Sequence, residues 1–204
     1  MGSVKAAAKA GYWWACGVMF VLRWLCGIKV VVTGVKNLPH TRPFIVASKH
    51  QSALETVFFM QYFKDPIFVL KRELTRIPIY GWYLKAMKMI SIDRFGGAAA
   101  LKKMLKESSA MLKSGRIIVI FPEGRRVKVG EVADIQSGIL AIHNSSPSTL
   151  VVPAFLNSGL RWPKGGWIKK PGFVTIHFAV PFSRQTRSKD ELIEYISENI
   201  NSMI

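Results

Sequence analysis

Acidic residues are scarce in this 204-residue sequence: 12 Asp and Glu stand against 29 Lys and Arg, which gives a formal net charge of +17. A charge this large is typical of disordered tails, but such tails are poor in apolar residues, and half of this chain is hydrophobic. Global disorder is therefore excluded. Strong positive charge combined with high apolar content favours a domain that faces an anionic partner, either a membrane surface or a nucleic acid.

Cysteine and the usual nucleophile motifs are also nearly absent. Cys16 and Cys26 lie ten residues apart in an apolar segment, without a CxxC pair or a histidine at metal-ligand spacing. We expect both to be small buried hydrophobic residues, and we expect no metal site. The sequence has no GxSxG nucleophile elbow and no P-loop, so any group transfer would use a nucleophile that a substrate supplies.

No apolar run reaches the roughly 20 residues that a membrane-spanning helix needs. Residues 10–22 are thirteen uncharged positions, and Arg23 and Trp24 follow them. This length favours a helical anchor that lies in the membrane interface or re-enters it, with a single span, a signal peptide and a plain core helix as competing interpretations. Arg23 and Trp24 stand where a signal peptide would have small residues, and tryptophan prefers the headgroup layer. We therefore expect residues 1–29 to form a membrane-anchoring helical segment.

Short apolar strands alternate with amphipathic helices along the rest of the chain. We expect strands over residues 29–33, 43–48, 66–70, 116–121, 150–156 and 173–180, a strand-like run at 90–94, and helices over 52–63, 101–112, 131–143 and 189–204. In the last strand, Val174, Ile176, Phe178 and Val180 should share the apolar face. This order predicts an α/β fold, in which residues 30–204 form a single domain with a central mixed sheet flanked by helices.

A histidine and a carboxylate follow the second of these strands. His50 lies at the junction between the strand and the next helix, and Glu55 lies five residues further on, in the first turns of a helix that Ser52 could cap. A carboxylate at this position could bond the imidazole Nδ1–H and stabilise the imidazolium that forms when Nε2 takes a proton. The pair therefore indicates a general base, although the spacing alone is weak. The other histidines, His40, His143 and His177, are interpreted as structural.

Further polar residues follow other strands. The run Phe121-Pro-Glu-Gly-Arg-Arg126 comes directly after the strand 116–121, and its Pro and Gly favour a turn that presents Glu123, Arg125 and Arg126. Arginine binds phosphate through two parallel hydrogen bonds, so this turn indicates a phosphate site. Another arginine, Arg94, ends the run Ile90-Ser-Ile-Asp-Arg94.

Taken together, these motifs resemble the four motif blocks of the glycerolipid acyltransferases, in the same order and at about the same spacing. The closest resemblance is to the short bacterial 1-acylglycerol-3-phosphate O-acyltransferases, over roughly residues 30 to 185. The residues that carry it are His50 with Glu55, the run Ile92-Asp-Arg94, the run Phe121-Pro-Glu-Gly-Arg125 and the run Val151-Val-Pro-Ala154. Two positions depart from the family pattern: Glu55 replaces the usual Asp, and Arg125 stands where Thr is commoner.

The resemblance implies direct acyl transfer from acyl-CoA or acyl-carrier protein to the sn-2 hydroxyl of lysophosphatidate, which gives phosphatidate. It implies His50 as the general base, Glu55 as its partner, and no metal or cofactor. It also implies a phosphate site formed by Lys71, Arg94, Glu123, Gly124 and Arg125, with the choice between Arg125 and Arg126 left open. The expected location is the cytoplasmic face of the bacterial inner membrane, where the N-terminal segment anchors the domain to an anionic surface.

Other functions remain as alternatives. A related acyltransferase could act on another lysolipid, such as a lyso-ornithine lipid, or on glycerol 3-phosphate. A non-catalytic membrane-binding protein would lack a use for the pair His50 and Glu55. A nucleic-acid binder would use the same positive charge, but the sequence has no helix-turn-helix, zinc or RRM signature, so we expect no nucleic-acid partner.

Overall fold

A computed structural model describes residues 2–41, 43–93, 96–183 and 191–202. Its centre is a seven-stranded sheet in the order β1-β7-β6-β2-β5-β3-β4. Neighbouring strands run parallel except β6 and β7, which confirms the predicted mixed sheet. The strands are β1 (Ile28–Thr33), β2 (Ile45–Ser48), β3 (Ile67–Lys71), β4 (Ile90–Ile92), β5 (Ile118–Ile120), β6 (Val151–Leu156) and β7 (Gly172–Phe178).

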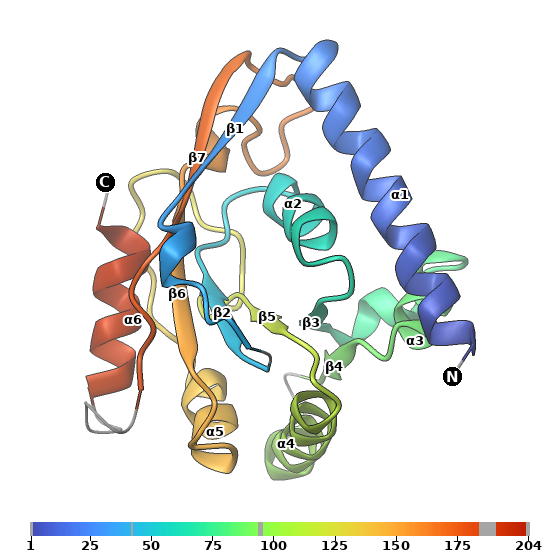
Figure 1. Cartoon of the computed structure of the whole chain (residues 1–204), viewed down its shortest axis with the longest axis vertical. Helices are drawn as coiled ribbons and strands as arrows, with labels where there is room; N and C mark the ends of the chain where they lie inside the picture. The colour runs from blue at the N-terminus through green and yellow to red at the C-terminus, as the bar shows by residue number, and fades with distance from the viewer. Residues whose placement is uncertain (1, 42, 94–95, 184–190, 203–204) are drawn as a thin grey trace.

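Helices cover both faces of the sheet, as Figure 1 shows: α1 and α2 lie on one side and α6 on the other. The helices are α1 (Gly2–Trp24), α2 (Leu54–Phe63), α3 (Tyr80–Ala86), α4 (Gly97–Lys113), α5 (Gly138–Ser145) and α6 (Glu191–Asn201). Three short 3₁₀ helices, η1 (Val35–Asn37), η2 (Arg72–Arg76) and η3 (Ser158–Leu160), lie between them. The predicted α/β architecture is therefore confirmed.

Helix α2 is the centre of the hydrophobic core on its side of the sheet. It is apolar around most of its circumference, and such a helix is stable when both of its sides are covered. The rings of Phe59 and Phe63 pack against Phe178 of β7, with centroids 6.4 and 6.2 Å apart. Helix α1 contacts the opposite side of α2, so α2 lies between the sheet and α1 (Figure 1).

Helix α1 buries one face and exposes the other. Ala15 and Leu22 belong to the core. Gly11 lies against the side chain of Tyr83 in α3. A Cβ at position 11 would lie 2.0 Å from the Tyr83 hydroxyl oxygen, so a larger residue would clash there. The large apolar side chains that α1 exposes are mostly aromatic: Trp13, Trp14, Phe20 and Trp24. None of the helices in the described ranges is both long and apolar enough to cross a membrane.

The structure corrects several local expectations. The helix predicted over 131–143 begins at Gly138. The Glu131 carboxylate accepts a hydrogen bond from Lys128 N and forms an ion pair with Arg125, and these contacts favour a loop at the predicted helix start. Strand β7 ends at Phe178, and Val180 is exposed. Helix α2 begins at Leu54, two residues after Ser52.

Helix α3 and the two cysteines also differ from the expectations, and one predicted helix start is not tested. Helix α3 was not expected, because its seven residues are too few to show a helical period. Cys16 and Cys26 are half-buried where full burial was expected. The predicted start of the last helix at residue 189 lies outside the described residues, and α6 is seen from Glu191 onward.

Candidate functional site

Loops that carry the sequence motifs meet at one edge of the sheet. Strands β2, β5 and β6 are parallel neighbours, so their carboxyl ends lie at the same edge. The chain leaves β2 into His50, leaves β5 into Phe121, and leaves β6 into Ser158. Ligands of open parallel sheets bind outside these ends, which makes this edge the candidate site.

A short hydrogen bond joins the two residues of the predicted pair. His50 Nδ1 lies 2.9 Å from Glu55 Oε1. Because an ionised carboxylate only accepts hydrogen bonds, the ring must donate from Nδ1, and the lone pair of the neutral imidazole is on Nε2. The side chain of His50 remains 16% exposed, whereas that of Glu55 is fully buried. The base therefore faces outward while its partner lies within the protein.

The carboxylate of Glu55 also binds the loop around it. Oε1 accepts the backbone N–H groups of Gln51 and Ser52, each at 2.7 Å, and Oε2 accepts the hydroxyl of Ser158 at 2.7 Å. Glu55 is in the first turn of α2, where the helix dipole favours a negative charge. Four donors therefore satisfy a charge that would otherwise be costly to bury.

The ring of Phe121 fixes the plane of the imidazole. It stacks on His50 with centroids 3.9 Å apart and an angle of 15° between the rings. Its other side faces Phe68 of β3, with centroids 6.3 Å apart. His50 therefore has a fixed orientation from Glu55 at its Nδ1 edge and from Phe121 at its face.

A second buried carboxylate, Glu123, lies behind the histidine. Its Oε2 accepts the backbone N–H of His50 at 2.7 Å, and its Oε1 has no hydrogen-bond partner among the described residues. Only 4% of the residue is exposed. Burial raises the pKa of Glu123 to about 7, against the lowering effects of the His50 N–H and of the Lys49 ammonium. Glu123 therefore holds the backbone of the histidine, and its burial favours the protonated form more than in an exposed carboxyl group.

The ammonium of Lys49 supplies a positive charge beneath these groups. Lys49 is fully buried, and its Nζ donates hydrogen bonds to the backbone oxygen of Glu131 at 3.1 Å and to Asn201 Oδ1. Burial lowers its pKa, although Glu123 and Glu131 oppose that effect. Through Asn201, which ends α6, this lysine connects the site to the far side of the sheet.

The predicted phosphate ligands lie further out. Gly124 has a left-handed φ of 67°, and its N–H donates to Phe121 O at 2.9 Å, which closes the turn that a larger residue would strain. Arg125 follows with its guanidinium exposed and paired with Glu131. Lys71, at the end of β3, is also exposed. Arg94 lies outside the described residues.

Two contacts at the end of β6 were not predicted. Besides the bond from Ser158 to Glu55, the backbone N–H of Gly159 donates to Gln51 Oε1 at 3.1 Å. One feature of the sequence could have indicated these contacts. The run Asn157-Ser-Gly159 directly follows a predicted buried strand, as the motif residues do. No group of described residues has the ligands for a metal ion.

Comparison with known proteins identifies the family. A family model named Acyltransferase matches residues 29–157, which include the pair His50 and Glu55 and the turn at Glu123. The chain belongs to the acyltransferase family. This membership confirms the resemblance that the motifs indicate.

Two relatives of this acyltransferase, from Pseudomonas and Borreliella, have the same name. The chain is 39% identical to a 1-acyl-sn-glycerol-3-phosphate acyltransferase of Pseudomonas aeruginosa over 165 residues, which are 80% of this chain and 63% of that protein. It is 29% identical to a protein of the same name from Borreliella burgdorferi, over 89% of this chain and 70% of the relative. The chain thus spans somewhat less than two thirds of the Pseudomonas protein.

A solved structure is also similar to this acyltransferase. The crystal structure of a 1-acyl-sn-glycerophosphate (LPA) acyltransferase from Thermotoga maritima superposes with a TM-score of 0.77 at 26% identity, over 96% of this chain and 77% of the other. The shared fold includes the mixed sheet and the helices on both sides of it.

Replacing Ser158 tests the support of Glu55. In Ser158→Ala, Glu55 Oε2 loses its hydroxyl donor, and an unsatisfied buried acceptor costs about 1–3 kcal/mol. We expect kcat for acyl transfer to fall about tenfold, with Ser158→Thr retaining most of the rate. Ser145→Ala is the matched control, since among the described residues its hydroxyl bonds only the backbone of Ile142. Equal rates for Ser158→Ala and the control would contradict this role.

Proposed function

We propose that this acyltransferase-family chain moves an acyl group from a thioester donor to the sn-2 hydroxyl of lysophosphatidate and so forms phosphatidate. The observation that carries this proposal is the base His50, whose side chain is partly exposed and whose Nδ1 is bound by the buried Glu55. The names of the Pseudomonas and Thermotoga relatives support the choice of acceptor. Acyl-CoA and acyl-carrier protein are the two candidate donors.

The proposed reaction needs one proton carrier. His50 Nε2 accepts the proton of the acceptor hydroxyl as its oxygen attacks the thioester carbonyl carbon. The tetrahedral intermediate then collapses, the C–O ester bond remains, the C–S bond breaks, and the imidazolium returns the proton to the leaving sulfur. The negative charge of Glu55 stabilises the imidazolium, and general-base catalysis of this kind contributes about 10²–10⁴ in rate.

The acceptor phosphate needs cations at the same edge of the sheet. We propose that Lys71 and Arg94 supply them together with the turn at Gly124 and Arg125. The ion pair from Arg125 to Glu131 leaves the outer side of the guanidinium exposed for a phosphate oxygen. Glu123 is better suited to positioning, because its carboxylate is buried against His50 N and would repel a phosphate.

The decisive assay is an acceptor panel with purified protein, one acyl-CoA and product mass analysis. We expect lysophosphatidate to be acylated in preference to glycerol 3-phosphate and lyso-ornithine lipid. His50→Ala should lower kcat by at least 10²-fold, because the hydroxyl proton then has no acceptor, while lipid binding persists. His177→Ala removes a bond to Thr33, which lies on β1 away from the site, and should retain the rate.

Two results would count against this function. If another lysolipid is acylated and lysophosphatidate is not, the acceptor is wrong although the base remains. If His50→Ala turns over as fast as the unchanged protein, the base itself is wrong.

We further propose that residues 1–29 anchor the domain, formed by residues 30–204, to the cytoplasmic face of a bacterial inner membrane. The exposed aromatic face of α1, with Trp13, Trp14 and Trp24, supports this proposal, because indole rings favour the headgroup layer. Helix α3, which α1 contacts, adds exposed Trp82. The net charge of +17 would attract anionic lipid.

Vesicle binding tests the anchor. We expect the triple variant Trp13→Ser/Trp14→Ser/Trp24→Ser to bind phosphatidylglycerol vesicles at least tenfold more weakly in a flotation assay, because three indole rings no longer enter the interface. The control Val132→Ser/Val180→Ser removes exposed apolar side chains elsewhere and should bind as the unchanged protein does. Equal binding by both variants would contradict the assignment of α1.

A further inference from the structure

The loop that joins η3 to β7 exposes two large apolar side chains. It comprises residues 161–171, and its tip is the run Pro163-Lys-Gly-Gly-Trp-Ile168. The side chains of Trp167 and Ile168 are 92% and 79% exposed. Adjacent exposed apolar side chains of this size mark an interaction surface more often than isolated ones do. The loop 161–171 is therefore a candidate interaction surface.

Contacts within the loop fix its shape. Lys170 N donates a hydrogen bond to Arg161 O at 2.8 Å, which closes the base of the loop. The ring of Trp162 packs against the hydrophobic core, and Lys169 Nζ lies 4.7 Å from its centroid. The same ammonium donates to Trp167 O at 2.9 Å. The backbone of Trp167 is thus held by the base of the loop while its indole ring is exposed.

The charge of this loop is entirely positive. Its sequence contains Arg161, Lys164, Lys169 and Lys170 and no Asp or Glu. Lysines near an anionic bilayer are attracted to the lipid phosphates, and indole rings favour the headgroup layer. Exposed lysines beside an exposed tryptophan therefore complement the interface of an anionic bilayer.

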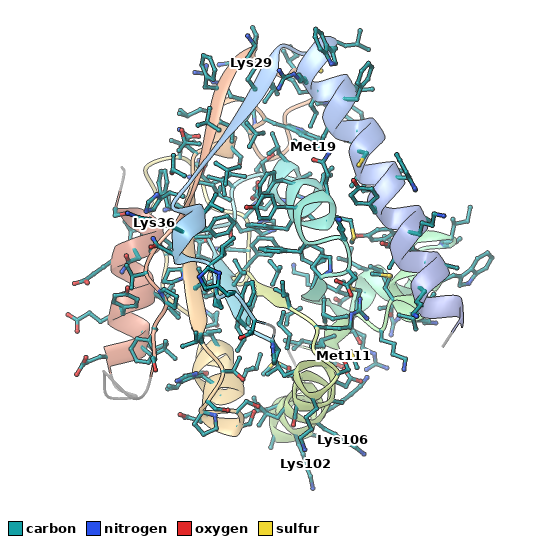
Figure 2. The ribbon with its side chains drawn as sticks, viewed as in Figure 1. Met19, Lys29, Lys36, Lys102, Lys106 and Met111 are labelled. Atoms are coloured by element: carbon teal, nitrogen blue, oxygen red, sulfur yellow. The ribbon has the colours of Figure 1, made fainter. Side chains whose placement is uncertain are left out.

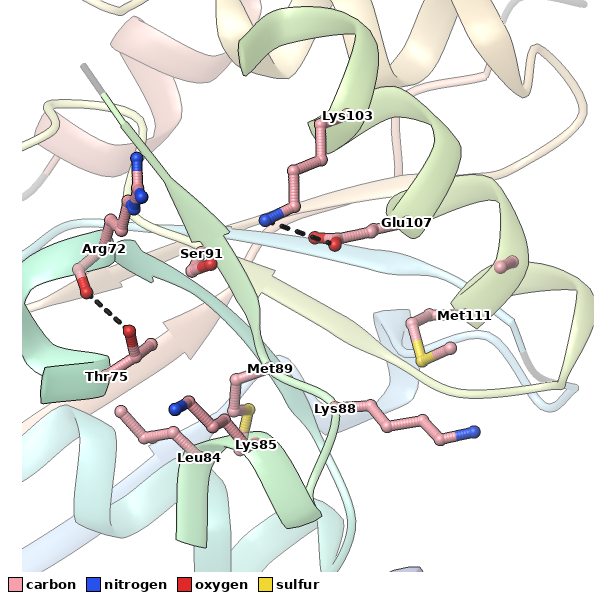
Figure 3. Close-up of a pocket in the computed structure, with 11 residues that line it drawn as sticks. Arg72, Thr75, Leu84, Lys85, Lys88, Met89, Ser91, Lys103, Glu107 and Met111 are labelled. Atoms are coloured by element: carbon pink, nitrogen blue, oxygen red, sulfur yellow. Dashed lines mark hydrogen bonds and ion pairs between the residues drawn. The ribbon is translucent and has the colours of Figure 1, made fainter. Parts of the chain in front are cut away.

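The lysines of α4 have different surroundings. Lys102 and Lys106 are exposed at the opposite end of the molecule from Lys29 of β1, the strand that pairs with β7 beside the loop (Figure 2). Helix α4 contains no aromatic residue. In the pocket beside β4, Lys103 of the same helix forms an ion pair with Glu107 at 3.8 Å (Figure 3). Exposed aromatic rings next to lysines therefore distinguish the loop 161–171 from α4.

The loop adjoins the C-terminal end of α1. Gly172 N donates a hydrogen bond to Gly27 O at 2.9 Å, and Pro171 lies against Gly27. Figure 1 shows the loop between β7 and this end of α1. Trp24 and Leu25, which lie just before Gly27, are also exposed. The loop therefore extends the exposed aromatic surface of α1 with a segment that is distant in the sequence.

The loop is also joined to the candidate site. Ser158 O accepts the N–H of Trp162 at 2.9 Å, while the Ser158 hydroxyl donates to Glu55 Oε2. One end of the loop is thus fixed to the residue that supports the partner of His50. A bilayer bound by the loop would therefore have a fixed position relative to the base.

We propose that the loop 161–171 is a second membrane contact, with Trp167 and Ile168 among the headgroups of an anionic bilayer and its lysines on the lipid phosphates. The inference extends the proposed attachment by α1, and it rests on the proposed acyl transfer only for its kinetic consequence. A single helix in the interface leaves the domain free to rotate about the helix axis. A second contact fixes the orientation in which a lipid hydroxyl reaches His50. An acidic protein is less favoured as the partner, because α1 places lipid beside the loop.

Titration of the full chain with phosphatidylglycerol vesicles tests the apolar tip. In Trp167→Ser/Ile168→Ser the lipid concentration at half-maximal binding should rise at least tenfold, because two apolar side chains no longer enter the interface. Val132→Ser/Val180→Ser is the control and should bind as the unchanged protein does. Vesicles of brominated lipid should quench less tryptophan emission in Trp167→Phe than in the unchanged protein. Equal binding by the tip variant and the control, or equal quenching with and without Trp167, overturns the proposal.

A second pair of variants tests the charge of the loop. Each lysine near an anionic surface contributes roughly fivefold to binding, so Lys164→Gln/Lys170→Gln should bind phosphatidylglycerol vesicles at least tenfold more weakly and phosphatidylcholine vesicles equally well. The control Lys102→Gln/Lys106→Gln removes the same charge at the other end of the molecule and should bind more tightly than the loop variant. Equal losses in both variants contradict a contact at the loop. If the loop variant binds acyl-carrier protein more weakly but vesicles equally well, the partner is the acidic protein and the proposal is wrong.

Kinetics separate the membrane contact from damage to the site. For Trp167→Ser/Ile168→Ser, kcat/KM should fall at least fivefold with lysophosphatidate in vesicles. With a short-chain, water-soluble lysophosphatidate it should stay the same, because the site itself is intact. Equal losses with both acceptors would contradict the proposal. If no lysolipid is acylated, the proposed function fails, but the vesicle titrations still test the loop.

Discussion

The carboxylate of Glu55 is the group on which the rest of the site depends. It lies fully buried at the start of α2 and accepts hydrogen bonds from the His50 ring, from two backbone N–H groups and from Ser158. An isolated buried charge would be expensive, and these donors compensate for the loss of water around the carboxylate. Their common position fixes the loop after β2 and gives His50 the tautomer that a general base requires.

The order of the strands makes this arrangement possible. Because β2 lies between β6 and β5, loops that are more than a hundred residues apart in the chain meet around one histidine. β6 contributes Ser158, and β5 contributes Phe121 and Glu123. Helix α2, covered by the sheet and by α1, holds Glu55 against this edge. Helix α1, which faces the proposed membrane surface, thus packs directly against α2, which begins at the site.

Much of the fold and the central pair could be predicted from the sequence. Strands such as Val151–Leu156 can be predicted from the sequence. Such a strand is buried on both faces, so its residues form a continuous hydrophobic run. His50 and Glu55 are close in the chain, so their pairing could be predicted from their spacing together with the other motifs. The bond from Ser158 to Glu55 spans 103 positions and depends on strand order, which no local pattern specifies.

The remaining differences between the predictions and the structure also arise from tertiary contacts. The loop before α5 replaces a predicted helix, since Glu131 has partners in Arg125 and Lys128 that only the folded turn provides. The raised pKa of Glu123 likewise results from burial, which is a property of the tertiary structure. The order of the strands in the sheet is a tertiary property as well, and no local pattern in the sequence shows it.

The protonation of the His50 ring tests the central claim most directly. Nitrogen-15 NMR of selectively labelled histidine, assigned with His50→Gln, reports which ring nitrogen carries the proton in the neutral form. The account predicts the Nδ1–H tautomer for His50, with an unprotonated Nε2, and loss of that preference in Glu55→Ala. A neutral ring protonated at Nε2, or a tautomer unaffected by Glu55→Ala, would contradict it.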